Sequence, residues 1–514
     1  MDENDLPGVE AGAEDLLTID EAAKFLDTSK STIYRLLGGG DVKGTKVGKQ
    51  WRFRKPDLLA YLQRTPETVS VAESARGELE AEIAHFDDLI GAPAGESESI
   101  EASTPQSQSH EAILVVTPSE SAPGQLARRI IRLAIDSRAS DIHIERISDV
   151  LRLRFRIDGM LHEIRRMPPA FADALIAKFK EMADMNVSER RLPQDGRLPI
   201  LYGDREFDFR VSSLPVLQGE DIVMRILDRS SVLLGLERLG IAEDMLQPLR
   251  AVVRRPSGMV IASGPTGSGK TTLLYSILQE IATDGIKAVS IEDPVEYQLQ
   301  NVSQAQVNRK AGMTYAMAMR AFMRQDPDII YCAEMRDRDS AEIAIEAALT
   351  GHMLFTALHT EDAPSVITRL TDIGLEPYLV AATLNCAIAM RLVRRLCPEC
   401  KTIASPQEIA PTVDKIRSLS HWGGYTIPER AVFFEPVGCP ACRNTGYQGR
   451  FGLQEILFCN AKLVQDLMRC SSVEEKRQVA VDAGMRTLLA DGISKAVAGE
   501  TTIDEALRAT GTWL

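Results

Sequence analysis

The chain has 514 residues, of which 44% are hydrophobic, and a formal net charge of −14 at pH 7. This length suggests roughly three domains, and this composition is ample for hydrophobic cores. The acidic balance argues against a protein that wraps nucleic acid along its whole length, although a single basic domain can still bind it.

Three features of the sequence favour a cytosolic protein. Residues 1–15 form an acidic tail, expected to be disordered, without the positive start of a signal peptide. No uninterrupted apolar stretch approaches the roughly 20 residues that span a bilayer. The eight cysteines do not suggest a disulfide scaffold in a chain this long.

Residues 16–64 predict a small winged helix-turn-helix domain. Apolar residues recur at helical spacing on both sides of a turn at residues 27–29, and two short strands follow around Gly48, like a wing. The segment holds ten lysines and arginines against five aspartates and glutamates, so it is basic within an acidic chain. It resembles the excisionase/MerR-type winged helix-turn-helix domain.

That resemblance implies DNA binding, with the second helix in the major groove and the wing against the backbone. The residues that would face DNA are Ser29, Lys30, Ser31, Thr32, Tyr34 and Arg35, with Lys46, Lys49, Arg52 and Arg54 near phosphates. The alternative is a protein-docking domain whose basic residues form a solvated face, since fold alone does not settle function. Both interpretations stay open.

Residues 65–112 predict a flexible acidic linker. They hold eleven acidic residues against one arginine, Arg76, with many small and polar residues and few aromatics. Such a composition cannot bury enough apolar surface to order the segment. Residues 78–90 have helical spacing, which favours a transient helix over a recognition helix for a partner.

Residues 113–232 predict an α+β domain. The pattern indicates helices at 125–135 and 171–185, and strands at 140–145, 151–157, 206–212 and 221–227. Alternation along the strands places several arginines on one face: Arg152, Arg154, Arg156, Arg210 and Arg225. Either this is an exposed face paired with carboxylates, or some of these arginines reach a phosphate.

Residues 259–274 contain the motif GxxxxGK[ST] between an apolar strand, Met259 to Ala262, and the start of a helix. Glycine permits the close backbone approach and the positive φ that a phosphate-binding nest needs. Lys270 is expected at the β- and γ-phosphates of a nucleotide and the Thr271 hydroxyl at Mg²⁺. The predicted nucleotide contacts are Gly264, Pro265, Thr266, Gly267, Ser268, Gly269, Lys270, Thr271 and Thr272.

Acidic residues end two later apolar strands, where open α/β sheets place their ligands. Glu292, Asp293 and Glu296 follow the first and are candidates to contact Mg²⁺-bound or attacking water, with surface solvation as the alternative. Glu334 closes the strand that begins at Asp328 and is the preferred catalytic residue, because a carboxylate there can orient water for attack on the γ-phosphate.

His352 and His359 stand at the two ends of another apolar strand. A lone histidine is usually structural, whereas a pair around a strand of a nucleotide enzyme can sense the γ-phosphate.

Two C-P-x-C pairs, Cys397 with Cys400 and Cys439 with Cys442, supply the four thiolates of a structural Zn²⁺ site. The 38 residues between the pairs exceed the usual spacing of a zinc ribbon. The alternative is two unrelated reduced pairs, and the other four cysteines read as ordinary thiols.

In this order, RASDIHIE, RLPQDGRL, RVSSLPVLQGE, GPTGSGKTT, IEDPVEY, RQDPDIIYCAEMRD, TGHMLFTALHT and the paired cysteine knuckles resemble the type II secretion and type IV pilus assembly ATPases. The resemblance covers about residues 113–514. It implies an α/β fold: a PAS-like α+β domain at 113–232, then a RecA-like P-loop ATPase domain at 233–514 that includes a four-cysteine zinc subdomain at about 393–452. It also implies ATP, Mg²⁺ and Zn²⁺ as ligands and a ring of six subunits.

The resemblance assigns further roles. It implies that residues 292–296 form the Asp box, that Glu334 is the Walker B acid and that residues 352–359 form the histidine box. Arg210 and Arg225 match arginines that reach the nucleotide from the PAS-like domain, and Arg320 and Arg324 match arginines of the catalytic domain. One departure is Ala333, which stands where the family usually has glycine.

The expected function is that of a cytoplasmic ring ATPase associated peripherally with the inner membrane. It would drive assembly of a type IV pilus or a type II secretion pseudopilus, with an inner-membrane platform protein and the cytoplasmic domain of a membrane protein as partners. Retraction motors of the same superfamily lack the cysteine knuckles, which favours assembly. One alternative is a DNA-linked motor or regulator that uses residues 16–64, and another is a nucleotide-gated scaffold with negligible turnover.

Overall fold

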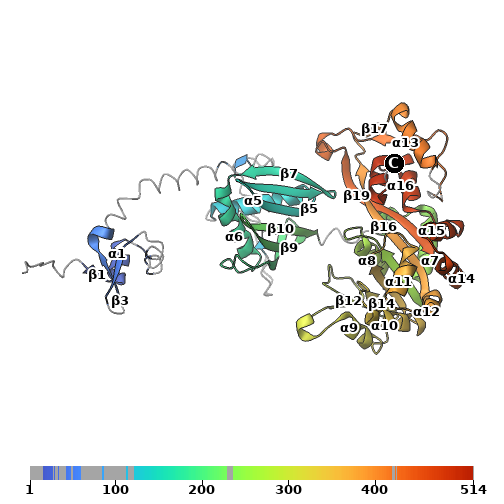
Figure 1. Ribbon diagram of the computed structural model, residues 1–514, viewed down its shortest axis with the longest axis horizontal. Helices are drawn as coiled ribbons and strands as arrows, with labels where there is room; N and C mark the ends of the chain where they lie inside the picture. The colour runs from blue at the N-terminus through green and yellow to red at the C-terminus, as the bar shows by residue number, and fades with distance from the viewer. Residues whose placement is uncertain are drawn as a thin grey trace, which may run out of the picture.

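The computed structural model describes residues 16–58 with gaps, residues 81, 84–85 and 112–113, and residues 121–512 apart from 229–234, 419–422 and 424. Three folded parts follow one another along the chain (Figure 1). We refer to them as the N-terminal domain (up to residue 58), the middle domain (112–228) and the C-terminal domain (235–512).

The N-terminal domain contains a helix and a small antiparallel sheet in the order β1-β3-β2. Its elements are β1 (Leu16–Leu17), α1 (Ile19–Phe25), β2 (Gly44–Val47) and β3 (Gln50–Arg54). A capping box starts α1, because Thr18 Oγ1 accepts from the Glu21 N–H while Glu21 Oε2 accepts from the Thr18 N–H. The first helix and both wing strands are thus confirmed. Most of the predicted second helix lies outside the described residues, and so do Ser29, Ser31, Thr32, Tyr34, Arg35 and Lys49.

The middle domain is a seven-stranded sheet in the order β4-β8-β9-β10-β5-β6-β7, with two helices packed against it (Figure 1). Its elements are β4 (Ala112–Ile113), α5 (Ala122–Asp136), β5 (Ala139–Ile147), β6 (Val150–Ile157), β7 (Met160–Met167), η1 (Pro169–Phe171), α6 (Ala172–Met182), β8 (Gln194–Tyr202), β9 (Arg205–Val216) and β10 (Gly219–Asp228). Alternate residues of the strands, such as Ile142, Phe155 and Phe209, form one core with Ile130 of α5 and Phe179 of α6. Strands β7 and β8 were not predicted.

The C-terminal domain is built on a seven-stranded sheet in the order β13-β12-β14-β15-β11-β16-β19, in which only β16 and β19 pair antiparallel. The first half contains η3 (Leu236–Leu239), α7 (Glu243–Val253), β11 (Gly258–Ser263), α8 (Lys270–Ile281), β12 (Ala288–Glu292), β13 (Val302–Gln306), η4 (Arg309–Ala311), α9 (Tyr315–Phe322), β14 (Ile329–Cys332), α10 (Arg338–Leu349), β15 (Met353–Leu358), α11 (Ser365–Asp372) and α12 (Pro377–Thr383). The second half contains β16 (Leu384–Leu396), β17 (Thr402–Ile403), α13 (Pro406–Ser418), β18 (Phe434–Glu435), η5 (Pro440–Cys442), β19 (Tyr447–Phe458), α14 (Ala461–Arg469), α15 (Val473–Asp482), α16 (Leu488–Val497) and α17 (Ile503–Thr510).

Both faces of this sheet are covered by helices. Met259 and Ile261 of β11 belong to a core shared with α9, α10, α11, α12 and α14, whereas Val260 and Ala262 belong to a core shared with α7 and α8. A parallel strand buried on both faces reads as a continuous apolar run, which is why the sequence predicted β11 within one residue of its observed ends.

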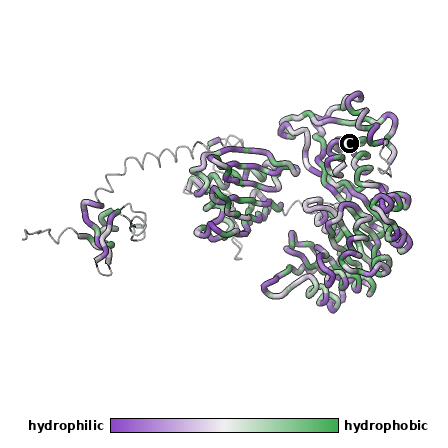
Figure 2. The backbone as a smooth tube through the Cα atoms, viewed as in Figure 1, coloured by the Kyte–Doolittle hydropathy of each residue, from purple (hydrophilic) through white to green (hydrophobic). Residues whose placement is uncertain are grey.

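Hydrophobic and hydrophilic stretches alternate along the tube in Figure 2. Among the residues that the structure describes, none of the helices combines the length and the apolar character needed to cross a bilayer.

Candidate functional site

Four strands of the C-terminal sheet bring the predicted nucleotide residues to one edge. Strands β11, β14, β15 and β12 are parallel, so their carboxyl ends meet at the same edge, where α/β sheets bind ligands. The phosphate loop, residues 264–269, follows β11, and Glu334 and His359 follow β14 and β15. Because β15 lies between β11 and β14, His359 stands between the phosphate loop and Glu334.

The backbone of the phosphate loop needs its glycines. Gly264, Gly267 and Gly269 have φ values of 141°, 77° and 99°, a region that residues with a β-carbon rarely adopt. A β-carbon on Gly264 would also lie 2.6 Å from the carbonyl oxygen of Met390. Helix α8 begins at Lys270, so Thr271 and Thr272 lie in its first turn, where free N–H groups favour an anion.

The Lys270 ammonium lies against the phosphate loop. Its Nζ donates to the carbonyl oxygens of Gly264 at 2.7 Å and Pro265 at 2.9 Å. Burial lowers the pKa of Lys270 to about 8; the carboxylate of Glu334 acts in the opposite direction, and the charge of Arg391 lowers the pKa further. The phosphate loop therefore holds the positive charge of Lys270 at a position where the negative charge of a bound phosphate would neutralise it.

Glu334 is held by two side chains. Arg336 Nη2 lies 2.7 Å from Glu334 Oε2, and His359 Nε2 lies 3.3 Å from Glu334 Oε1. The Ala333 N–H donates to the carbonyl oxygen of Ile291 at 3.0 Å, and the methyl group of Ala333 packs against the core shared with α7 and α8. Arg336 was not among the predicted site residues, although its place two residues after Glu334 is a signal in the sequence.

The three carboxylates after β12 have different surroundings. Glu292 is 1% exposed and accepts hydrogen bonds from Ser290 Oγ at 2.6 Å, from Gln304 Nε2 at 2.9 Å and from the Tyr275 hydroxyl. Burial raises the pKa of Glu292, and these donors act against the rise. Surface solvation is therefore wrong for this residue, and its oxygens are already bonded within the domain.

Asp293 pairs with Arg309, at 3.2 Å. Glu296 Oε2 accepts from Arg210 Nη2 of the middle domain at 2.6 Å, so this carboxylate joins the two domains.

The two histidines lie at opposite ends of β15. The His352 ring nitrogen Nδ1 lies 2.9 Å from the carbonyl oxygen of Ala347 and 3.2 Å from Thr350 Oγ1, beside the end of α10. The six residues of β15 separate His352 from His359, and seven steps of ~3.3 Å place the two about 23 Å apart. The structure thus brings His359, but not His352, to Glu334.

Arginines form a row across the sheet of the middle domain. The register places Arg197 of β8 opposite Arg210 of β9, Arg210 opposite Arg225 of β10, Arg225 opposite Asp141 of β5, and Asp141 opposite Arg156 of β6. Asp141 pairs with Arg225 at 3.1 Å and with Arg156 at 3.5 Å. Like charges directly opposite each other destabilise a sheet, and the carboxylates of Asp141 and Glu296 offset this repulsion in the row.

The other predicted arginines are divided. Arg152 and Arg154 both pair with Glu145 within the middle domain. Arg320 and Arg324, in α9 and just after it, are exposed, and Arg324 Nη1 donates to the Arg320 carbonyl oxygen at 3.0 Å.

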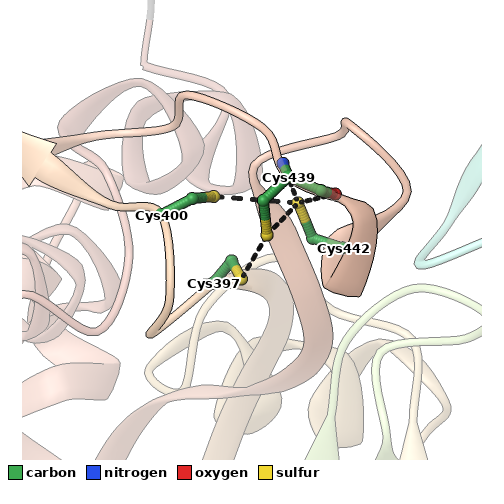
Figure 3. A group of neighbouring side chains, drawn as sticks. All are labelled: Cys397, Cys400, Cys439 and Cys442. Atoms are coloured by element: carbon green, nitrogen blue, oxygen red, sulfur yellow. Dashed lines mark hydrogen bonds between the residues drawn. The ribbon is translucent and has the colours of Figure 1, made fainter.

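The four predicted zinc ligands converge (Figure 3). Their sulfurs lie within 4.8 Å of one another, with Sγ to Sγ distances of 3.8 Å between Cys397 and Cys439 and 3.7 Å between Cys400 and Cys442. Four sulfurs held ~2.3 Å from one tetrahedral ion would be about 3.8 Å apart. Although burial alone raises it, N–H groups of Cys439 and Gly446 lower the pKa of the Cys442 thiol to about 6. The donor set therefore fits Zn²⁺.

Two family models match the chain. The model described as type II/IV secretion system protein matches residues 119–508, and a helix-turn-helix domain model matches residues 16–66. The second match agrees with the domain predicted at residues 16–64.

Curated relatives cover three quarters of the chain. The type II secretion system protein E of Xanthomonas campestris is 43% identical over 388 residues, which are 75% of this chain and 67% of that protein. The type IV pilus assembly ATPase PilB of Myxococcus xanthus is 42% identical over 384 residues, which are 74% of this chain and 67% of that protein.

A solved structure shares the fold. The ATPase DotB of Legionella pneumophila matches with a TM-score of 0.55 and 19% identity, over 79% of this chain and all of that one. This likeness confirms the predicted α/β fold class.

Proposed function

Because the chain belongs to the type II/IV secretion system protein family, we propose that it binds Mg²⁺-ATP at the carboxyl edge of the C-terminal sheet and hydrolyses it to ADP and phosphate. The observation that carries the proposal is the placement of Lys270 against the phosphate loop and of Glu334 and His359 beside it. These groups supply a cation for the phosphates and a carboxylate to orient water.

Each residue has a role in this reaction. The backbone N–H groups of residues 266–272 and the Lys270 ammonium bind the phosphates. Glu334 accepts a hydrogen bond from the attacking water, and His359 holds the Glu334 carboxylate in place. Thr271 would hold Mg²⁺, which neutralises charge on the β- and γ-phosphate oxygens when it is bound.

Arginines complete the charge balance around the γ-phosphate. Arg210 and Arg225 lie on adjacent strands of the middle domain, and Arg210 already contacts the C-terminal domain through Glu296. A movement of the middle domain would therefore carry guanidinium groups toward or away from the nucleotide. Arg320 and Arg324 are exposed and would act on the site of a neighbouring subunit in a ring.

We further propose that ATP turnover drives assembly of a type IV pilus or a type II secretion pseudopilus. The relatives are named for these two systems. The chain would form a ring of six subunits in the cytoplasm and act on an inner-membrane platform protein and on the cytoplasmic domain of a second membrane protein. Particle mass measured with and without an ATP analogue tests the ring.

Substitutions at the two central residues test ATP hydrolysis. Lys270→Ala and Glu334→Gln should each lower phosphate release by about 100-fold or more while the chain stays folded, because each removes a group that acts on the reacting phosphate. The matched controls are Lys462→Ala and Glu342→Gln, at exposed positions of α14 and α10, which should behave as wild type. Negligible phosphate release by the wild-type chain would instead indicate a nucleotide-gated scaffold.

The N-terminal domain has a second candidate function in binding DNA. Its match to a helix-turn-helix model and its local excess of positive charge favour this. Mobility shifts of duplex DNA with the full chain, run across a salt series, separate the two alternatives. Binding that weakens steeply with salt and is lost in Arg52→Ala/Arg54→Ala indicates DNA, whereas no shift at low salt indicates a docking domain for another protein.

A further inference from the structure

The strand β16 passes directly beside the phosphate loop. Its pairing with β11 ends at Ser263 opposite Ala389, and the next residues, Met390 and Arg391, lie at the edge where Gly264 begins the loop. A β-carbon on Gly264 would lie 3.2 Å from Arg391 Nη1. The guanidinium of Arg391 therefore packs against the first glycine of the phosphate loop.

The Arg391 guanidinium joins two separate stretches of backbone. Its Nη1 donates to the carbonyl oxygen of Met390 at 3.0 Å, and its Nη2 donates to the carbonyl oxygen of Glu361 at 2.9 Å. Glu361 belongs to the loop that follows β15, and this loop begins with His359. Burial lowers the pKa of Arg391, and the nearby carboxylates of Glu361, Glu455 and Asp362 act against that effect. The half-buried positive charge of Arg391 is thus stabilised by hydrogen bonds to two carbonyl oxygens and by carboxylates at a longer range.

The far end of the same loop is fixed independently. The Ala363 N–H donates to Glu455 Oε1 of β19 at 2.8 Å, and the Leu488 N–H donates to Glu455 Oε2 at 3.1 Å. Glu455 stands opposite Ala389 in the register of β16 and β19, two residues before Arg391. The loop from His359 to Ala363, which we term the histidine loop, is therefore held at its middle by Arg391 and at its end by Glu455.

We propose that Arg391 is a positioning residue that joins the phosphate loop to the histidine loop, so that His359 and Glu334 respond to the terminal phosphate of ATP. This inference rests on the proposed ATPase activity. A planar guanidinium can serve two carbonyl oxygens and pack on the glycine at once, whereas a lysine ammonium in the same place presents one point charge. The position therefore requires arginine rather than any cation.

The substitution Arg391→Lys in the full chain tests the proposal by binding. The measured quantities are the Kd values of a non-hydrolysable ATP analogue and of ADP, both with Mg²⁺. Loss of the two hydrogen bonds to carbonyl oxygens should raise the Kd of the ATP analogue by about tenfold and change the Kd of ADP by less than about threefold. The reason is that only ATP carries the terminal phosphate that the histidine loop would contact. Arg395→Lys is the matched control, since Arg395 lies on the same strand but pairs with Glu500.

Turnover gives a second readout. Arg391→Lys should lower kcat, and the double variant with His359→Ala should be no slower than His359→Ala alone, because the lysine then has no histidine left to misplace. A merely structural role would instead make the two losses additive.

The outcomes separate the two proposals. Three results would each overturn the positioning role of Arg391. They are an equal rise in the Kd values of ADP and the ATP analogue, additive losses in kcat, and Kd and kcat values of Arg391→Lys that match those of Arg395→Lys. If Arg391→Lys does not fold, as judged by its melting curve, Arg391→Gln is measured in the same way. Absence of phosphate release from the wild-type chain would contradict the ATPase proposal, and the ratio of the two Kd values would still decide the role of Arg391.

Discussion

At the scale of single residues, Glu455 is a carboxyl group buried under the active edge of the sheet. It is 3% exposed, and burial raises the pKa of Glu455 to about 7, with the charge of Asp362 adding to the rise and the N–H groups of Ala363 and Leu488 opposing it. Between the ordinary value of 4.5 and about 7, the folded chain keeps a proton that the unfolded chain has lost. Stability should therefore fall as pH rises through this window.

The substitution Glu455→Gln should remove this contribution to the pH dependence. A shift of this size corresponds to at most roughly 3 kcal/mol between the two ends of the window. Midpoints of urea unfolding of the full chain, measured from pH 4.5 to 8, should decline more steeply for wild type than for the variant. Glu342→Gln, which changes an exposed carboxylate, should follow wild type. Parallel profiles for wild type and Glu455→Gln would contradict the assignment.

The site residues that could be predicted from the sequence are those whose chemistry is written in contiguous motifs. Lys270, Glu334 and the four cysteines each follow from local spacing and from a strand or loop beside them. Arg391 could not be predicted, because its position beside Gly264 depends on β16 lying next to β11, a neighbourhood set by strand order. His352 and His359 lie at opposite ends of β15, and only the carboxyl end reaches the site. The sequence motif contains both histidines and does not show which end of the strand faces the site.

At the scale of elements, the segment between β16 and β19 depends on its cysteines. Cys397 follows β16 directly, and Cys442 ends η5 shortly before β19. An ion bound by both C-P-x-C pairs would therefore link the end of β16 to the start of β19. Beyond this, residues of α13, α16 and α17 share a small core. A metal ion bound at the cysteines would contribute its binding free energy to the stability of this small subdomain.

We therefore expect one zinc ion per chain and a melting temperature that depends on it. Cys400→Ser should lose the metal and lower the melting temperature by several degrees, because a structural zinc site contributes its binding free energy to folding. Metal analysis of the purified full chain and a thermal melt with and without chelator measure both. Cys470→Ser, outside the cluster, should retain the metal. A chain that holds no zinc and melts unchanged in chelator would favour two unrelated pairs of thiols.

Helices and strands could be predicted where burial gives their apolar residues a clear pattern along the sequence. The strands β11, β12 and β14 are buried at every residue and read as apolar runs. Strand β8 was missed because Gly196 and Pro199 read as turn residues. Gly196 is in fact needed for packing, since a β-carbon there would lie 2.3 Å from the carbonyl oxygen of Ala183, just after α6. Strand β7 has few buried residues and so no clean alternation.

At the scale of the whole molecule, side chains of the described residues join the middle and C-terminal domains. Arg210 pairs with Glu296, the Arg443 Nη2 donates to the Asp136 carbonyl oxygen at 2.7 Å, and the Gly449 N–H donates to Asp158 Oδ2 at 3.1 Å. The first lies on the arginine row, and the other two involve Arg443 and Gly449, which follow Cys442 of the cysteine cluster along the chain. These contacts pair residues distant in sequence, so no local pattern predicts them.

The Arg210 contact predicts unequal effects of two arginines on one strand. Arg210→Ala should lower kcat by about tenfold or more, because a guanidinium that stabilises the transferred phosphoryl group is then missing. Arg205→Ala, on the same strand β9 but paired with Asp228 within the middle domain, should leave kcat unchanged. Steady-state phosphate release of both variants measures the difference. Equal kcat values of the two variants would contradict a role of Arg210 in ATP hydrolysis and leave it only a role in holding the two domains together.

The strand β16 leads from Arg391, beside the phosphate loop, to Cys397 of the cysteine cluster, with one irregularity in its pairing to β19 between Arg394 and Leu396. Arg391 and Cys397 are six positions apart, about 20 Å of extended chain at ~3.3 Å per residue. An extended strand paired with β19 resists stretching, so the backbone between Arg391 and Cys397 keeps these two residues at a nearly fixed separation. An ion bound at the four cysteines would therefore be connected to the nucleotide edge of the sheet through a single strand.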